Sequence, residues 1–468
     1  MIFNILNSGA QLILTHATAV LGFILALLVT SRAFREKKRP GNFFAWFFLV
    51  LFVPLIAGPL YLIFGGRKSR KTTQIKRRVT QEALALSGSE THDSARVAID
   101  KTAGNKITLL PNGEVFYDRI CQEIKVAKTT IHIATYIFGK GAPATKIAEL
   151  LAQQARNGLT VRLLLDSLGC WNTTRRLRCR LRSAGVEVAM FMPVIPFQTH
   201  SNANLRNHRK LAIFDHRCAL VGGHNIDRRF IGANHDPTRF ADLSVAISGP
   251  AVAHLSRTFI ADWAFATRRN AAAFKPTLEY QPEKRGNSAI NVIASGPDVP
   301  NDPLWEQILL LINTFKEQLT IITPYFIPDE VIFQTLIVQA RSKKKIRIIL
   351  PLRSNHAITD IARHNYLEGL HDAGVEIRFF TERMLHAKLT IADDSHALLG
   401  SANIDMRSLF LNFEIGLLHH AKSDITALTA WADSINEKSI DYEAAIKKEG
   451  FLPSRTAASF VRLIEPLL

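Results

Sequence analysis

The segment that decides the fold of this chain is His386-Ala387-Lys388-Leu389-Thr390-Ile391-Ala392-Asp393, followed closely by Gly400-Ser401-Ala402-Asn403. In an extended strand, residues i and i+2 point to the same face, so the histidine and the lysine lie side by side. A lysine ammonium beside an imidazole offers a place for a phosphate next to a nucleophile or proton shuttle. The aspartate ends the run, and the small residues that follow suit a tight turn around a bound anion.

A second copy of the pattern lies upstream, with His208, Lys210 and Asp215 at the same spacing and Gly222-Gly223-His224-Asn225 behind them. One copy alone is equally well explained as a buried strand with a paired histidine and lysine, because short patterns recur by chance. Two copies with matching spacing and matching tails argue against chance. The apolar residues beside each pair predict strands that are buried on both faces.

The region around the two copies is itself duplicated. Residues 181–191 match residues 370–380, and residues 131–138 match residues 319–326 at nearly the same interval. Each half alternates apolar strand patterns with helical patterns, which predicts an α/β fold with a mostly parallel sheet covered by helices. Two lobes related by a pseudo-twofold axis would bring both His–Lys pairs to one cleft.

Two uncharged stretches, residues 11–31 and 43–64, lie near the amino terminus. Each has about 21 residues, enough at roughly 1.5 Å per residue to cross a hydrocarbon core of about 30 Å. Basic residues after the second stretch slightly outnumber those between the two, which favours a cytosolic position for the large domain. The predicted segments are a transmembrane hairpin at 1–66, a basic linker at 67–97, a first lobe at 98–275 and a second lobe at 276–468.

The composition indicates an anionic partner. The formal net charge is +18 and the isoelectric point is about 9.9, which suits nucleic acid or an anionic membrane surface. The two apolar stretches and the lack of an obvious aromatic stacking motif favour the membrane bilayer, and no nucleic acid is expected. The four cysteines are scattered without a C-x2-C pair, so we expect neither a zinc site nor a disulfide framework. The sequence gives no indication of the oligomeric state.

At its two H-x-K-x4-D segments the chain resembles the phospholipase D superfamily, and the wider pattern is similar to the bacterial cardiolipin synthases. The resemblance covers essentially the whole chain. Its supporting segments are Gly58–Gly65, Ser295–Asp298, Thr323–Asp329, Asp405–Glu414 and Arg462–Leu468.

The resemblance implies a phosphatidyltransferase in the bacterial cytoplasmic membrane, working without a metal or other cofactor. Two phosphatidylglycerol molecules would give cardiolipin and glycerol through a phosphohistidine. One histidine would attack phosphorus, and the other would protonate the departing glycerol and then deprotonate the incoming hydroxyl. The residues leave open which histidine is the nucleophile, with a preference for His208.

The remaining site residues have different expected roles. Lysines and asparagines would hold the phosphoryl oxygens as charge builds, and the resemblance makes Asp242 and Glu414 candidates to orient the histidines. Asp215 and Asp393 are expected to brace the segments rather than to carry protons. The candidate catalytic set is His208, Lys210, Asp215, His386, Lys388 and Asp393. The candidate substrate-binding set is Asn225, Asn403, Ser401, Asp242 and Glu414.

Three departures from the family pattern leave the acceptor open. Residues 226–230 lack the expected spacing of an acidic residue and an aromatic one, residues 238–242 lack a tryptophan before the aspartate, and residues 139–144 lack an acidic residue. The acceptor could therefore be phosphatidylglycerol, phosphatidylethanolamine, another alcohol or water. One alternative is a hydrolase of the same superfamily, which the catalytic residues do not distinguish from a transferase. The other is a membrane-anchored nucleic-acid-binding protein without turnover, and the two intact segments argue against that loss of activity.

Overall fold

The computed structural model describes residues 15–28, 31, 47–48, 50–53, 70–88, 101–171, 173, 175–193 and 204–449. The chain forms two compact units. One comprises Met1–Ser69 with Pro453–Leu468, and the other comprises Arg70–Leu452.

In the first unit, residues 15–28 are helical, as are residues 47–48 and 50–52. Among the residues that the structure describes, no helix is both long enough and apolar enough to cross a membrane. The predicted spans 11–31 and 43–64 fall only partly on described residues. Their other parts, and the basic loop between them, lie outside the described ranges.

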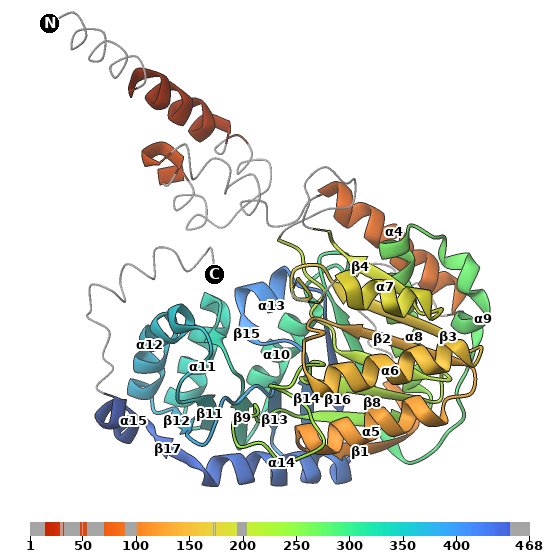
Figure 1. Ribbon diagram of the computed structural model, residues 1–468. Helices are drawn as coiled ribbons and strands as arrows, with labels where there is room; N and C mark the ends of the chain where they lie inside the picture. The colour runs from red at the N-terminus through yellow and green to blue at the C-terminus, as the bar shows by residue number, and fades with distance from the viewer. Residues whose placement is uncertain are drawn as a thin grey trace, which may run out of the picture. The chain divides into compact units, whose positions relative to one another are not determined.

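A single sheet of fifteen strands runs through the second unit, with the two repeats side by side (Figure 1). The repeats meet where the first strands of each half, β1 and β8, pair antiparallel. In the order in which they lie outward from this junction, the strands of the first half are β1 (Lys101–Leu110), β7 (Ser244–Ser248), β6 (Cys218–Gly222), β5 (Leu211–Phe214), β2 (Thr130–Thr135), β3 (Thr160–Asp166) and β4 (Glu187–Phe191).

The second half repeats this order on the other side of the junction. Its strands are β8 (Ser288–Ser295), β16 (Glu414–His419), β14 (His396–Gly400), β13 (Leu389–Ala392), β9 (Gln318–Ile322), β11 (Lys345–Pro351), β12 (Glu376–Phe380) and β17 (Ser439–Asp441). A separate parallel pair joins β10 (Phe326–Ile327) to β15 (Ile404–Asp405). The matching strand orders confirm the predicted α/β class and the duplication.

The prediction of a mostly parallel sheet is wrong. Only β2–β3–β4 and β9–β11–β12 pair in parallel, and the other neighbours in the sheet are antiparallel. The short turns at residues 215–217 and 393–395 account for two of the antiparallel pairs, β5–β6 and β13–β14, because a connection this short can only join antiparallel strands. Strands β5 and β13 are buried on both faces, as predicted.

Helices cover both faces of the sheet. On one face, α5 (Gly113–Val126), α6 (Ala142–Arg156) and α7 (Arg175–Ser183) pack on the first half. On the second half, α10 (Pro303–Thr314), α11 (Glu330–Arg341), α12 (Ala357–Asp372) and α15 (Tyr442–Glu449) share another core, which α13 (Met406–Phe410) completes. A third core spans both halves beneath α8 (Ala251–Thr267) and α14 (Lys422–Glu437), with η1 (Ala271–Phe274) and α9 (Lys275–Glu279) at its edge.

The prediction of a linker at 67–97 needs correction for residues 70–86. They form helix α4 (Arg70–Leu86), which joins the core beneath α8 (Figure 1). The helix presents Ile75, Val79, Ala83 and Leu86 to that core, a spacing that places apolar side chains on one helical face. The basic residues on its other faces hide this stripe from a composition-based interpretation.

Candidate active site

Each of the two histidines lies just before a central strand. His208 precedes β5 and His386 precedes β13, so both enter the sheet from matching places in the repeat. Lys210 Nζ donates to the His208 carbonyl at 2.7 Å, and Lys388 Nζ donates to the His386 carbonyl. Lys388 Nζ also lies 2.9 Å from Nδ1 of the His386 ring. Each lysine therefore lies directly beside its histidine, although the regular strand begins only after the lysine.

The carboxylate partner of each histidine comes from the other half of the chain. Nδ1 of His208 lies 2.9 Å from Glu414 Oε1, at the start of β16. Nδ1 of His386 lies 2.6 Å from Asp242 Oδ2, just before β7. Both carboxylates are fully buried. A histidine that is bound to a carboxylate through Nδ1 keeps Nε2 available for chemistry.

Backbone hydrogen bonds repeat the same exchange between the halves. The His208 amide donates to the Phe413 carbonyl at 2.9 Å, and the His386 amide donates to the Ala241 carbonyl at 2.7 Å. These bonds fix each histidine main chain to the residue before its acidic partner. The imidazole–carboxylate geometry is therefore set by the main chain as well as by the side chains.

Burial and the charges of both lysines perturb the two imidazoles. Burial lowers the pKa of His208, and Lys388 of the other half adds to that lowering against the opposing effect of Glu414. Burial lowers the pKa of His386 to about 3, helped by Lys388 and Lys210. Both imidazoles are consequently neutral near pH 7 in the free protein.

The lysines are perturbed by the same burial. It lowers the pKa of Lys210 to about 7 and that of Lys388 to about 8, despite the nearby carboxylates. In the opposite sense, the pKa values of the acids fall despite burial. His386, through its hydrogen bond, and the charge of Lys388 hold the pKa of Asp242 well below its usual range, and His208 and Lys210 lower the pKa of Glu414. A buried phosphate would in turn favour the protonated form of the two lysines, which is how such a site can accept an anion.

Asp215 and Asp393 lie at the far ends of β5 and β13 from the histidines. Four residues of extended chain, at about 3.3 Å each, lie between either aspartate and its lysine. Asp215 accepts backbone hydrogen bonds from residues 128–130, and Asp393 accepts them from residues 316–318. Both stand in the left-handed region, with φ of 50° and 53°. These two members of the predicted catalytic set are therefore not brought to the site, and they brace the turns instead.

The small-residue tails lie beside the carboxylates. Ser401 Oγ donates to Glu414 and accepts from the Ile415 amide at 3.0 Å, so it holds the carboxylate in place. The matching residue in the first half is Gly223, where a Cβ would come within 1.9 Å of Asp242 Oδ1. Only glycine leaves room for Asp242 there.

The two asparagines of the tails are buried and differ in their partners. Asn225 Oδ1 accepts from the Ile137 amide at 3.2 Å. Asn403 Nδ2 donates to Asp405 at 3.1 Å, and its Oδ1 has no hydrogen-bond partner among the described residues.

Aromatic residues around the histidines were missed from the sequence. Tyr136 packs edge-on against His208, with ring centroids 4.9 Å apart, and its ring lies 5.5 Å from Lys210 Nζ. Phe230 packs edge-on against His386 at 4.9 Å. Tyr136 belongs to the duplicated segment 131–138, so its place in the repeat was the signal that could have found it.

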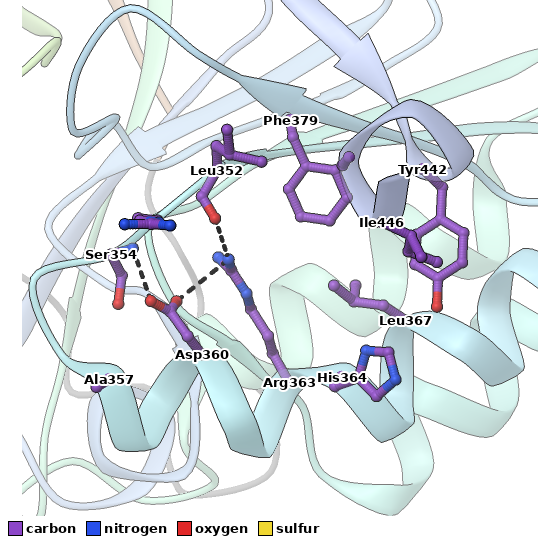
Figure 2. A pocket seen from close by; sticks show the side chains of 12 residues that line it. Leu352, Ser354, Ala357, Asp360, Arg363, His364, Leu367, Phe379, Tyr442 and Ile446 are labelled. Atoms are coloured by element: carbon purple, nitrogen blue, oxygen red, sulfur yellow. Dashed lines mark hydrogen bonds and ion pairs between the residues drawn. The ribbon is translucent and has the colours of Figure 1, made fainter. Parts of the chain in front are cut away.

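The cavity in Figure 2 has a volume of about 390 Å³ and lies between α12 and α15; His364 lines it, but His208 and His386 do not. Arg363 points inward but is bound to the Leu352 carbonyl at 2.8 Å and to Asp360 at 3.2 Å. Phe379, Tyr442 and other apolar side chains form the opposite wall. None of the predicted site residues lines this cavity.

In the described part of the chain, no cluster of three or more histidine, cysteine or acidic side chains could hold a metal ion. The four cysteines are free; Cys179 is exposed, and the others are buried.

Comparison with known proteins identifies the family of the chain. A family model described as cardiolipin synthase, PLD-like domain, matches residues 120–263 and 308–436, and a phospholipase D-nuclease N-terminal model matches residues 23–66. Cardiolipin synthase 1 of Bacillus anthracis is 30% identical, with 93% of this chain and 91% of the relative covered. The major cardiolipin synthase of Bacillus subtilis is 28% identical, with 96% and 98% covered. The crystal structure of phosphatidylserine synthase from Haemophilus influenzae shares the fold, with a TM-score of 0.59 and 14% identity over 83% of this chain and 100% of that one.

The duplicated fold and the two His–Lys segments are those of a phospholipase-D-like protein. Within that class, the chain belongs to the cardiolipin synthase family. The predictions of a phosphatidyltransferase and of cardiolipin synthase function are confirmed at the level of this family, and phospholipids are the substrates that such a function implies.

Proposed function

We propose that this enzyme joins two phosphatidylglycerol molecules into cardiolipin and releases glycerol through a phosphohistidine. The observation that carries the proposal is the pair of imidazole–carboxylate contacts, His208 with Glu414 at 2.9 Å and His386 with Asp242 at 2.6 Å. Two imidazoles, each with a carboxylate on Nδ1, can divide the work between a neutral nucleophile and a proton carrier.

In the first step, Nε2 of one histidine forms a bond to phosphorus while the bond between phosphorus and the glycerol oxygen breaks. Once the anionic phosphodiester is bound, the second histidine carries a proton on Nε2; it gives this proton to the leaving oxygen, so glycerol leaves neutral and the imidazole becomes neutral. In the second step, the hydroxyl of another phosphatidylglycerol attacks phosphorus, its proton passes to the second histidine, and the N–P bond breaks. Lys210, Lys388 and the two asparagines would hold the phosphoryl oxygens as negative charge builds.

We assign the nucleophile to His208, whose side chain is 12% exposed against 7% for His386. Rapid quenching with phosphatidylglycerol labelled at phosphorus tests the assignment. The label is expected on His208. Label on His386 would reverse the roles, and label on neither histidine during turnover would contradict the covalent route.

The acceptor is tested with purified full-length protein in vesicles of labelled phosphatidylglycerol, with and without phosphatidylethanolamine. Cardiolipin with one glycerol released per product is the expected result. Phosphatidic acid alone would mean that water is the acceptor and that the protein is a hydrolase. A cardiolipin yield that rises with phosphatidylethanolamine, with ethanolamine instead of glycerol released in proportion, would identify that lipid as a substrate. His208→Ala should abolish all of these products, and His235→Ala, at an exposed histidine of the same half, serves as the matched control.

We further propose that residues 1–66 form a transmembrane hairpin in the bacterial cytoplasmic membrane and that the catalytic unit faces the cytosol. The uncharged stretches 11–31 and 43–64 support this, as does the N-terminal family match over 23–66. The lobes would span 98–275 and 276–468, forming one pseudo-twofold catalytic unit. Cysteines placed at residues 32–42 should react only from the periplasmic side; labelling from the cytosol would invert the orientation.

A further inference from the structure

A cluster of four charged side chains is buried behind the His208 segment. Lys76, on α4, lies 3.1 Å from Asp262 Oδ1 and 3.1 Å from Asp298 Oδ2. Arg209 Nη1 contacts the same Asp262 carboxylate at 2.7 and 2.6 Å. All four side chains are at most 3% exposed. Two cations and two carboxylates balance one another, which is the condition under which buried charges persist.

The cluster ends on the main chain of a proposed site residue. Arg209 Nε donates to the Glu414 carbonyl at 3.0 Å, and its Nη2 donates to the Ser295 carbonyl at 3.0 Å. Glu414 in turn accepts from Nδ1 of His208 with its carboxylate. A continuous set of contacts therefore runs from α4 through Asp262 and Arg209 to the acid that orients His208.

Further hydrogen bonds hold the cluster rigid. Thr80, one helical turn after Lys76, accepts from Lys76 Nζ at 2.8 Å and donates to Asp298 at 2.7 Å. Asn207 donates to Asp262 at 3.0 Å and so ties the residue before His208 to the same carboxylate. Burial raises the pKa of Asp298, but Lys76 and Arg209 together hold it below its usual value, so the carboxylate stays charged.

Among the described residues of the second half, no counterpart to this cluster is found. Ala387 stands between His386 and Lys388, where Arg209 stands between His208 and Lys210. Asp262 lies 20 positions after Asp242, and the residue 20 positions after Glu414 is Ser434. The Asp242–His386 contact forms without these charges. The repeat itself therefore shows that the fold does not require them, which points to a role specific to His208.

We propose that Lys76 is a positioning residue for His208, acting through Asp262 and Arg209 to fix the main chain of Glu414. It touches neither His208 nor Lys210; its effect is to hold Arg209 in the one position that serves Glu414. The inference rests on the proposed function insofar as His208 is catalytic. It also gives α4 a purpose beyond covering the core, since this helix directly follows the N-terminal unit in the chain.

The test compares Lys76→Met with Arg77→Met, which removes the same charge from an exposed neighbour on α4. Release of the glycerol headgroup from phosphatidylglycerol is followed, because this first step is common to transfer and hydrolysis. For Lys76→Met, kcat should fall about tenfold or more with little change in KM, as for residues that orient a catalytic group indirectly. Arg77→Met should match the wild type, and Lys76→Arg should recover most of the rate.

The pH profile separates positioning from simple loss of folded protein. The charged and aromatic groups facing His208 are Glu414, Lys210, Lys388 and Tyr136. Weakening the contact with Glu414 makes the imidazolium less favourable, so the inflection due to His208 should move to lower pH in Lys76→Met. A variant that merely contained less folded protein would lose rate at every pH without moving the inflection. Circular dichroism and thermal unfolding report the folded fraction directly.

A second variant protects the test against misfolding. Lys76→Met with Asp298→Asn leaves Arg209 balanced by Asp262 alone, so it should fold and regain part of the lost rate. An unchanged rate and inflection in Lys76→Met, or a loss that Lys76→Arg and the double variant fail to relieve, would overturn the proposal. A different result would contradict the proposed function: wild-type protein that releases the headgroup but makes no cardiolipin. That result leaves the positioning role of Lys76 in the first step unaffected.

Discussion

His386 receives its carboxylate from Asp242, a residue of the other repeat, with Nδ1 and Oδ2 only 2.6 Å apart. His208 receives Glu414 in the same way. Neither half of the chain therefore contains a complete histidine–acid pair. The sheet that joins β1 to β8 is what completes the site, because it fixes the two halves at one relative position.

Replacing the acid should impair chemistry far more than folding. In Asp242→Asn the amide keeps the shape of the side chain but no longer stabilises an imidazolium at His386. We expect kcat to fall by roughly 10²–10⁴-fold, the range for loss of general acid–base function. Headgroup release by the purified variant measures this, with Asp236→Asn in the exposed loop as control. A kcat for Asp242→Asn within twofold of the control would contradict the role of this pair.

The adjacent glycine offers an independent way to disturb the same acid. In Gly223→Ala the new Cβ would come within 1.9 Å of Asp242 Oδ1, so the carboxylate must move. We expect at least a tenfold loss of kcat, because the His386 contact depends on that carboxylate. Gly369→Ala is the control, since its Cβ would meet only the far end of the Phe333 ring, at 3.2 Å. Equal rates for the two variants would show that the position of Asp242 is not limiting.

The lysines predict how anion affinity depends on pH. Their pKa values of about 7 for Lys210 and about 8 for Lys388 mean that they lose their protons in turn as the pH rises through this window. Inhibition by inorganic phosphate should therefore weaken from about pH 6 to about pH 9, and Lys388→Ala should flatten the upper part of the curve. Lys125→Ala, on the exposed face of α5, should leave the curve unchanged. Phosphate inhibition that is constant with pH in the wild type would contradict this.

The same shifts make a statement about stability. Because folding lowers the pKa of both lysines, the unfolded chain binds more protons than the folded one between about pH 7 and the ordinary lysine pKa near 10.4. The contribution of these groups to the free energy of unfolding therefore rises with pH across that window. In Lys210→Met this rise should be smaller, which urea unfolding at several pH values would detect. A steeper rise in the variant would show that the lysines are not buried in the free protein.

Asp393 should matter for stability and not for the chemical step. Its carboxylate accepts three backbone amides of residues 316–318, and a cap of this kind contributes roughly 1–2 kcal/mol. Asp393→Ala should lower the urea midpoint by a corresponding amount while kcat per folded molecule stays unchanged. Asp394→Ala, at the exposed neighbour, is the control. A large loss of kcat in folded Asp393→Ala would return this residue to the catalytic set.

The histidines, the lysines and the duplication could be predicted because each rests on short-range spacing that occurs twice. The acid partners were different: Glu414 lies 206 positions after His208, and only the family resemblance suggested it. Helix α4 was missed because its charged faces mask a narrow apolar stripe, and the strand directions were missed because strand patterns do not encode direction.

The buried contact between Lys76 and Asp298 also has a consequence for the order of assembly. These residues are 222 positions apart, so Lys76 is synthesised long before its second carboxylate. Strand β1 likewise pairs with β7 on one edge, and its other edge stays unpaired until β8 has been synthesised. During synthesis, the first half must therefore hold α4 with an incomplete set of charges until the second half begins to emerge. Late docking of this helix would couple the final maturation of the His208 site to completion of the polypeptide.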